Sequence, residues 1–317
     1  MPHINTILHG DVLDKLKEIE TESIQCVVTS PPYWGLRDYG SDGQLGLEET
    51  PELYVENMVN VFREIKRVLK DDGTCWLNLG DSYYGGGWKG ASLNKNSGDI
   101  QKAHKGTHCG EQIKHDPKHP IIKTKDLVGI PWRVALALQA DGWYLRQDII
   151  WHKPNPMPES VQDRCTKAHE YIFLLTKSAN YFYDADAVRE PVAESSIGRL
   201  NQNIDQQVGT TRANGGKKSN GNLKAVGDIE KGRNKRSVWT ITTKPYKEAH
   251  FAVFPPELPE LCIKAGSKEG DTVLDPFFGS GTTGWVAQRL GRKWIGIELN
   301  AKYIKIAEKR FAQRELF

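Results

Sequence analysis

A glycine-rich turn near the carboxyl end of the chain limits the possible folds more than any other feature. A short apolar strand at 272–274 leads into the run Asp275-Pro-Phe-Phe-Gly-Ser-Gly-Thr-Thr-Gly284, which opens a helix at 281–290. The glycines fit the spacing G-x-G-x-x-G, which lets the backbone pass close to a ligand and leaves free N–H groups at the helix start. A strand at 293–297 then ends at Glu298, whose carboxylate can accept hydrogen bonds from ribose hydroxyls. The pattern predicts a nucleoside-binding strand–turn–helix unit.

The residues before the first glycine indicate which nucleoside ligand binds. A nicotinamide dinucleotide is the usual ligand for this spacing. However, Asp275, Pro276 and Phe277 put an acid and bulk where a dinucleotide fold has a compact turn. Asp275 would repel a pyrophosphate, whereas it suits the ammonium group of an amino acid. S-adenosylmethionine carries an ammonium, a sulfonium and no phosphate, so we predict this cofactor. A purely structural turn is the alternative.

The rest of the chain alternates predicted strands with predicted helices. Strands are expected at 4–8, 23–30, 74–79, 144–151 and 171–176, and helices at 52–69, 126–140, 255–265 and from 301 onward. This alternation is typical of an open α/β sheet whose strands are mostly parallel. In such a sheet the active cleft lies at the carboxyl ends of the strands.

The motif Thr29-Ser30-Pro31-Pro32-Tyr33-Trp34 follows one of these strands, at such a carboxyl end. Its prolines fix the backbone and remove two N–H donors, so nearby carbonyls can face a ligand. Tyr33 and Trp34 offer faces on which a base can stack. Two acceptors on the N–H bonds of an exocyclic amine pull it toward tetrahedral geometry and free its lone pair to attack a methyl sulfonium. Ser30 and the Pro31 carbonyl are the predicted acceptors, and a simple turn is the alternative.

Together the two motifs carry a resemblance to a known family. The chain resembles the amino-methylating DNA methyltransferases of the β group, in which the catalytic motif precedes the cofactor motif, as Ser30 precedes Gly279 here. The resemblance covers nearly the whole chain outside two basic segments, 85–125 and 198–236. It implies an α/β, Rossmann-like, S-adenosylmethionine-dependent methyltransferase fold, with a mostly parallel sheet, one antiparallel strand and a permuted motif order. It also implies a target base flipped out of duplex DNA.

The resemblance assigns roles to individual residues. The catalytic motif is matched by Ser30, Pro31, Pro32 and Tyr33. The cofactor site is matched by Asp11 at the adenine amine, Glu298 at the ribose, Phe254 and Pro255 near the methionine, and, in the turn itself, Asp275, Phe277, Gly279, Gly281 and Thr282. The segment Asp148–Pro158 resembles the strand and loop beside the flipped base.

The residue at position 30 bears on the choice of base. Members of the group with Asp or Asn at this position mostly methylate adenine N6, and those with Ser mostly methylate cytosine N4. Ser30 therefore favours cytosine N4, with adenine N6 as the alternative. Cytosine C5 chemistry needs a thiolate, usually in a Pro-Cys pair, and none of the five cysteines follows a proline. An RNA or protein-amide methyltransferase and a catalytically silent DNA-binding protein are further alternatives.

The positive charge of the chain is concentrated in two segments. The formal net charge is +3, but residues 85–125 carry +5, residues 198–236 carry +6 and the remainder −8. This asymmetry suggests a polyanion that docks at two places, whereas two solvated loops are the alternative. We expect residues 190–237 to be a target-recognition segment. It separates a catalytic half at 1–189, which holds the basic insertion, from a cofactor half at 238–317.

Basic side chains are the predicted contacts to double-stranded DNA. Arginines and lysines contact phosphates, and arginines can also read base edges in the major groove. The candidates are Lys153 and Arg164 beside the cleft, and Arg199, Arg212, Arg233 and Arg236 in the recognition segment. The resemblance is compatible with a cognate restriction endonuclease as a partner, and the sequence with either a monomer or a homodimer.

Several other features receive a structural interpretation. A cluster of metal-binding residue types has irregular spacing, so no metal site is assigned to His104, His108, Cys109, His115 and His119. His169 and Glu170 begin a strand and are interpreted as a buried hydrogen-bonded pair. No membrane span or secretory signal is expected, because no run of eighteen apolar residues and no basic, apolar leader occurs. Scattered cysteines without C-x-x-C fit reduced thiols and a cytoplasmic location.

Overall fold

The computed structural model of the protein describes residues 3–36, 43–85, 119–195, 197, 231–244 and 254–312. The chain divides into two compact units. The larger unit comprises Met1–Phe182 and Val238–Phe317, and the smaller unit comprises Tyr183–Ser237.

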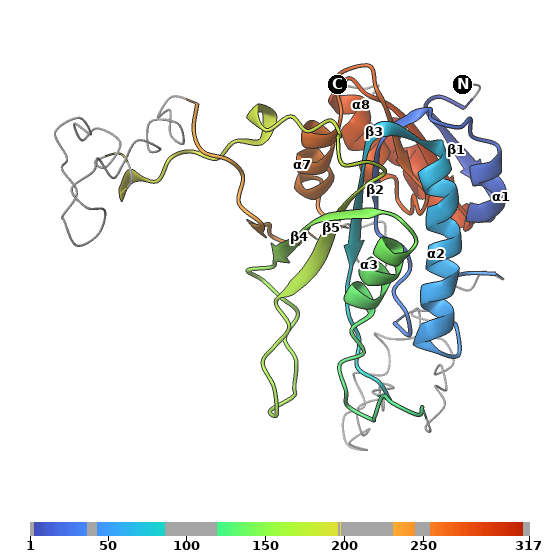
Figure 1. Cartoon of the computed structure of the whole chain (residues 1–317), viewed down its shortest axis with the longest axis vertical. Coiled ribbons are helices and arrows are strands. Elements are labelled where there is room, and N and C mark those ends of the chain that lie inside the picture. Colours follow the sequence, from blue (N-terminus) through green and yellow to red (C-terminus); the bar gives the residue numbers. More distant parts are fainter. Residues whose placement is uncertain are drawn as a thin grey trace. The chain divides into compact units, whose positions relative to one another are not determined.

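Runs of apolar residues in the larger unit form one eight-stranded sheet (Figure 1). The strands lie in the order β1 (Thr6–His9), β8 (Lys293–Glu298), β7 (Thr272–Asp275), β2 (Ile24–Thr29), β3 (Leu69–Leu79), β5 (His169–Thr176), β4 (Tyr144–His152) and β6 (Val238–Thr240). Among these eight strands β5 alone is antiparallel to its neighbours, and every other pairing is parallel. The expectation of a mostly parallel sheet with one antiparallel strand is confirmed.

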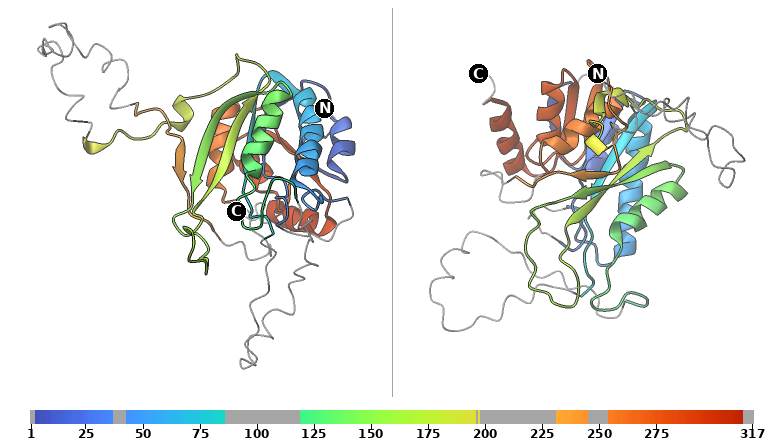
Figure 2. Two further views of the ribbon diagram at one scale, coloured as in Figure 1. Left: turned by 60° about the horizontal axis from the view of Figure 1, so that its bottom comes forward. Right: turned by 90° about the vertical axis from the view of Figure 1, so that its left-hand side faces the viewer.

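Helices cover both faces of this sheet (Figure 2). One face carries α1 (Val12–Lys17), α2 (Pro51–Val68) and α3 (Ile130–Ala140), and the other carries α7 (Glu257–Gly266), α8 (Thr282–Arg289) and α9 (Ala301–Ala312). All six residues of the central strand β2 are buried between the two helical layers. None of the helices in the described ranges has both the length and the apolar character needed to cross a bilayer.

Local signals explain where the helices begin. The Thr50 hydroxyl accepts a hydrogen bond from the Leu53 N–H and caps α2, whose first residue is Pro51. The helix expected at 126–140 begins later, at Ile130, because Gly129 adopts a left-handed conformation (φ +78°) just before it. The sequence analysis missed α1 and β6, since six and three residues are too few to establish a periodicity.

The sheet topology brings one end of many strands to the same edge. The parallel strands β1, β2, β7 and β8 finish there, at His9, Thr29, Asp275 and Glu298. Because β5 runs the opposite way, it starts at this edge. Both sequence motifs therefore meet at the carboxyl edge of the sheet, although they lie near opposite ends of the chain.

Two glycines allow the turn between β7 and α8 to pack closely on its neighbours. A Cβ atom built on Gly284 would lie 2.6 Å from the Phe278 ring, and one built on Gly296 would lie 2.4 Å from the same ring. The Phe278 ring also stacks on Trp294, with the centroids 5.2 Å apart. Phe278 thus anchors the glycine turn to both α8 and β8.

We expect Gly296→Ala to destabilise the protein by roughly 1–3 kcal/mol, the usual cost of overpacking a core. The backbone of Gly296 lies outside the left-handed region, so the cost comes from the contact with Phe278. Urea unfolding measures the change in free energy of unfolding. The double variant Gly296→Ala/Phe278→Leu should recover part of the loss, and an unfolding midpoint equal to that of the wild type in the single variant would contradict this packing.

Candidate functional site

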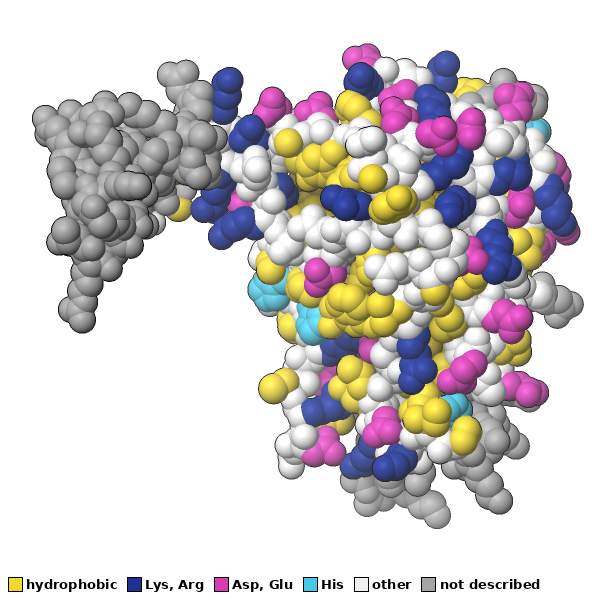
Figure 3. All heavy atoms as spheres, viewed as in Figure 1, with side chains coloured by type: hydrophobic (Ala, Val, Ile, Leu, Met, Phe, Trp, Pro, Cys, Tyr) yellow, Lys and Arg dark blue, Asp and Glu magenta, His cyan; other side chains and the backbone are white. Residues whose placement is uncertain are grey.

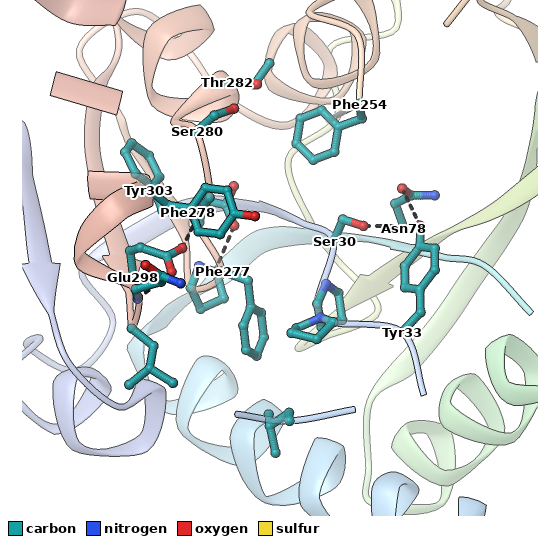
Figure 4. Close-up of a pocket in the computed structure, with 18 of the residues that line it drawn as sticks. Ser30, Tyr33, Asn78, Phe254, Phe277, Phe278, Ser280, Thr282, Glu298 and Tyr303 are labelled. Carbon is teal, nitrogen blue, oxygen red and sulfur yellow. Dashed lines mark hydrogen bonds between the residues drawn. The ribbon is translucent and has the colours of Figure 1, made fainter. Parts of the chain in front are cut away.

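A cavity of about 690 Å³ opens at the carboxyl edge of the sheet. Its wall includes Ser30, Pro31, Pro32 and Tyr33, which follow β2. It also includes residues that follow or end other strands, and these match the predicted cofactor site: Asp11, Phe254, Asp275, Phe277, Gly279, Thr282 and Glu298. Figure 4 shows Ser30, Tyr33 and Asn78 at one side of the cavity and Phe277, Glu298 and Tyr303 at the other. The predicted residues Gly281 and Pro255 are neighbours of wall residues in the chain.

The glycine turn and Glu298 form the cofactor side of the cavity. Gly279 adopts a left-handed backbone conformation (φ +52°), and its N–H donates to Glu298 Oε2 at 2.7 Å. The Asn300 N–H donates to Glu298 Oε1 at 2.8 Å. Burial raises the pKa of Glu298 above its ordinary value. Because a carboxylate oxygen has two lone pairs, each oxygen can still accept a ribose hydroxyl.

Asp11 caps a helix and lines the same side of the cavity. Its Oδ1 accepts hydrogen bonds from the backbone N–H groups of Leu13 (2.9 Å) and Asp14 (3.3 Å) and so caps α1. The cap fixes the orientation of a side chain that also lines the cavity. The second carboxylate oxygen can accept a hydrogen bond from an adenine amine.

Asp275 is buried and joins the two motifs. Its Oδ1 accepts from the Thr29 hydroxyl at 2.8 Å and from the Phe277 N–H at 3.1 Å, and its Oδ2 accepts from the Thr283 hydroxyl at 2.7 Å. Burial raises the pKa of Asp275 to about 6. The sequence analysis directed this carboxylate toward the ammonium of the cofactor. Its protein contacts tie the residue before Ser30 to the glycine turn, through two threonines to which the sequence analysis assigned no role. Asp275 also lines the cavity, so its contact with the cofactor ammonium stays a prediction.

A chain of hydrogen bonds extends from Ser30 at the other side of the cavity. The Ser30 hydroxyl donates to the Tyr33 hydroxyl at 3.2 Å. The Tyr33 hydroxyl has one hydrogen to share between Glu170 Oε2 (2.8 Å) and Asn78 Oδ1 (3.1 Å), and the Asn78 amide also donates to Glu170 (3.2 Å). Because Ser30 directs its hydrogen at Tyr33, its oxygen lone pairs are left as acceptors.

Glu170 and Lys153 complete this side of the wall. Lys153 donates to Glu170 Oε1, and its ammonium lies over the Trp151 ring, 4.2 Å from the centroid. Glu170 was expected to pair with His169, but its hydrogen bonds run to Tyr33, Asn78 and Lys153. The sequence analysis also missed Asn78. Its amide is the polar exception in the apolar end of β3, which is a signal that could have identified it.

The predicted DNA contacts differ in their surroundings. Arg164 pairs with Glu159 and lies over the Tyr83 ring at 4.0 Å. In the smaller unit, Glu190 pairs through its backbone with Arg233 and accepts a hydrogen bond from Arg236 at 2.9 Å. Arg199 and Arg212 lie outside the described residues. On the face in Figure 3, the basic and acidic side chains of the described residues are interspersed.

The histidine-rich cluster falls largely outside the described residues, which include only His119 of its members. The Nε2 of His119 lies 3.1 Å from Glu52 Oε2. Within the described part of the chain, no group of three or more His, Cys, Asp or Glu side chains is arranged to hold a metal ion.

Comparison with known proteins identifies the family. A family model described as DNA methylase, with N6 and N4 amino specificity in its name, matches residues 24–309. The chain belongs to this family of DNA methylases. It is 45% identical over 311 residues to the type II methyltransferase M.SmaI of Serratia marcescens, a match that covers 97% of this chain and 91% of that protein. It is 46% identical over 307 residues to M.Cfr9I of Citrobacter freundii, covering 96% and 87%.

Solved structures show the same fold. The PvuII cytosine-N4-specific DNA methyltransferase superposes with a TM-score of 0.65 at 21% identity, covering 96% of this chain and 86% of that one. A DNA modification methylase of Thermus thermophilus, TTHA0409, in complex with S-adenosyl-L-methionine, superposes with a TM-score of 0.57 at 23% identity, covering 97% and 93%. Because it belongs to the DNA methylase family, this chain is a DNA methyltransferase, an enzyme class whose methyl donor is S-adenosylmethionine.

The cavity of this methylase fits that cofactor. Among the described wall residues the cations are Lys153 and Lys244, and neither belongs to the glycine turn. A pyrophosphate at the turn would be repelled by the Asp275 carboxylate, whereas S-adenosylmethionine has no phosphate. Glu298 and Asp11 have carboxylate oxygens that can accept hydrogen bonds from a ribose and an adenine, and Phe254 and Phe277 add apolar surface to the wall.

We expect Asp275→Asn to change the pH dependence of stability. The pKa of Asp275 is about 6 in the folded protein, against an ordinary value of 3.8. The folded state therefore binds this proton more tightly, and the contribution of Asp275 to stability is full below about pH 4 and is lost as the pH rises through 6, by on the order of 3 kcal/mol. Asparagine does not ionise. The melting temperature of the variant relative to wild type should therefore increase from about pH 4 to about pH 7.

Asp275→Ala is the matched comparison. It leaves Thr29, Thr283 and the Phe277 N–H without their acceptor, so it should lower the melting temperature at every pH. A constant difference between Asp275→Asn and wild type across the pH range would contradict the buried, ionisable state of Asp275.

Proposed function

We propose that this DNA methyltransferase methylates N4 of a cytosine that is flipped out of duplex DNA at a specific sequence. The observation that carries the proposal is the Ser30 hydroxyl. It follows β2 at the cavity wall, and its hydrogen is directed at Tyr33. Its oxygen can therefore accept a hydrogen bond from an exocyclic amine in the cavity that also holds the glycine turn.

Two acceptors prepare the amine for attack. Pro31 and Pro32 offer no N–H groups, so the Pro31 carbonyl can accept one amine hydrogen while Ser30 accepts the other. This arrangement draws the nitrogen lone pair out of conjugation with the ring. S-adenosylmethionine, when held by the glycine turn and Glu298, would supply the electrophilic methyl group. No strong general base is required. The nitrogen becomes positively charged when it takes the methyl group, and it then loses a proton readily.

Tyr33 supports the target base. Gly80 lies against its ring, and a Cβ on Gly80 would be 2.5 Å from it. The hydrogen bonds of its hydroxyl fix the ring within the wall of the cavity. Flipping a base costs a few kcal/mol of lost stacking and pairing, and stacking on Tyr33 would offset part of this cost.

Two arguments favour cytosine N4 over adenine N6. The chain has Ser rather than Asp or Asn at the first position of its catalytic motif, as cytosine-N4 members of the β group mostly do. The PvuII enzyme, which is cytosine-N4-specific, shares the fold along 96% of this chain. Adenine N6 is the second candidate, because a hydroxyl can accept a hydrogen bond from either amine.

The remaining features bear on where the target sequence is recognised and on the partner system. We propose that residues 190–237 recognise the target sequence, with Arg199, Arg212, Arg233 and Arg236 on phosphates or base edges. The relatives are type II methyltransferases, which supports a cognate restriction endonuclease as the partner system.

We expect the purified protein to form N4-methylcytosine in unmethylated duplex DNA of mixed sequence. The DNA is incubated with S-adenosylmethionine, digested to nucleosides and analysed by mass spectrometry. N6-methyladenine instead would keep the fold, cofactor and site but overturn the assignment of the base. The absence of any methylated nucleoside would contradict the proposed activity and favour a silent DNA-binding protein.

We expect Ser30→Ala to lower turnover by on the order of 100-fold, the scale of losing one hydrogen-bonding group aimed at the reacting atoms. The affinity for S-adenosylmethionine should stay near that of the wild type, because Ser30 lies away from Glu298 and the glycine turn. Single-turnover kinetics and calorimetry measure the two quantities. Ser178→Ala, beyond the far end of β5, is the control and should change neither. Loss of cofactor binding in Ser30→Ala would contradict the assigned role.

A further inference from the structure

We propose that Lys153, held by Glu170, binds the ring acceptors of the flipped base and so selects the base by its Watson–Crick edge. This inference rests on the proposed function and names how its substrate is recognised. It replaces the phosphate contact that the sequence analysis predicted for Lys153.

Lys153 is much less exposed than a lysine on the open surface. Its side chain is 19% exposed and that of Glu170 is 16% exposed, whereas the Lys125 side chain, which pairs with Asp163, is 81% exposed. Lys153 lies in the wall of the same cavity as Ser30. The hydrogen bonds from Ser30 to Tyr33 and from Tyr33 to Glu170 connect Lys153 to the acceptor of the amine.

Lys153 has hydrogen-bond donors to spare. An ammonium group has three N–H donors. One goes to Glu170 Oε1, and the Trp151 ring lies beneath the charge. Among the described residues, no other acceptor for Lys153 is found. The remaining donors can therefore reach a ligand in the cavity.

Glu170 makes this arrangement possible in two ways. Its charge offsets the cost of a half-buried ammonium, which is high for an unpaired cation. Its second oxygen accepts from Tyr33 and Asn78, which fixes the carboxylate and thereby the ammonium. Glu170 is thus a positioning residue for Lys153.

The resulting pattern of donors and acceptors is complementary to cytosine. Its edge presents the N4 amine as a donor, followed by N3 and O2 as acceptors. Ser30 and the Pro31 carbonyl match the amine, and Lys153 matches N3 or O2. Thymine presents an acceptor at position 4, which is opposed by Ser30 and the Pro31 carbonyl, and an N–H at position 3, which is opposed by a Lys153 ammonium placed at that position. On its Watson–Crick edge adenine offers one acceptor beside its amine, the ring nitrogen N1, whereas cytosine offers two, the ring nitrogen N3 and the carbonyl oxygen O2.

The test compares binding to a target base with binding to an abasic site. Sequencing of DNA methylated by the wild-type protein first locates the target. Two labelled duplexes are then made, one with cytosine and one with an abasic residue at that position. Their dissociation constants are measured by fluorescence anisotropy with full-length protein and S-adenosylhomocysteine, over a range of salt concentrations.

We expect Lys153→Met to weaken binding of the cytosine duplex by about tenfold, the scale of one lost hydrogen bond to a charged group. The abasic duplex should bind the Lys153→Met variant as tightly as it binds the wild-type protein, and its affinity should depend on salt in the same way. Lys17→Met, an exposed lysine of α1, is the matched control. Equal weakening of both duplexes with a shallower salt dependence would overturn the proposal in favour of a phosphate contact. Unchanged binding of both would overturn it as well.

Two further variants separate recognition from folding. The preference for the base is the dissociation constant of the abasic duplex divided by that of the cytosine duplex. Lys153→Arg keeps the charge and the N–H donors, so this ratio should be closer to the wild-type value than it is in Lys153→Met. Glu170→Gln should reduce the preference without abolishing it, because Lys153 loses its anchor. Melting temperatures show whether each variant is folded. If Lys153→Met does not fold, the Glu170→Gln variant tests the proposal in its place. A preference for the base equal to that of the wild type in Glu170→Gln would then overturn the proposal.

The outcome is separable from the proposed function. Formation of N6-methyladenine by the wild type would overturn the cytosine assignment, and the comparison with an abasic site would then be made at the methylated adenine. A wild type that methylates cytosine, with a Lys153→Met variant that retains the full preference for the base, would overturn this inference alone.

Discussion

The buried carboxylate of Asp275 is the contact on which the architecture of the site depends. It ends β7 and receives hydrogen bonds from Thr29 at the end of β2 and Thr283 in α8. Because β2 and β7 are adjacent parallel strands, their ends meet in space whatever their order in the chain. The carboxylate then locks the loop that begins at Ser30 to the loop that begins at Pro276. Burying this charge is costly, as its raised pKa shows, and three donors offset part of the cost.

The antiparallel direction of β5 determines which side chains line one side of the cavity. A parallel strand at this position would finish at the carboxyl edge, whereas β5 starts there and brings Glu170 to the wall. Glu170 connects Tyr33 and Asn78 with Lys153. One side of the cavity is therefore built from backbone N–H groups and acceptors for a nucleoside, and the other from a network of polar side chains suited to an amine and its ring. A methyl donor and a methyl acceptor need such different surroundings within one cavity.

Much of the fold could be predicted from the sequence. The apolar run 23–30 and the helical spacing at 52–69 correspond to β2 and α2, because burial of a continuous face imposes a period that the chain must follow. The elements that were missed, α1 and β6, are too short for a period. The family resemblance implied the single antiparallel strand, which local pattern alone does not contain, since strand direction depends on pairing between distant segments.

The sequence by itself determined the two motifs, the cofactor that they suit and the residues that carry them, because prolines and glycines restrict the backbone locally wherever the chain goes. Only the tertiary structure decided what those side chains contact. It showed that Asp275, which the sequence analysis directed at the cofactor, also links the two motifs, and it placed Lys153 in the wall of the cavity. It also added Thr29, Asn78 and Glu170 to the site. Their partners lie on another strand or in the loop after β2, and the distances that join them exist only after the sheet has brought its strand ends to one edge.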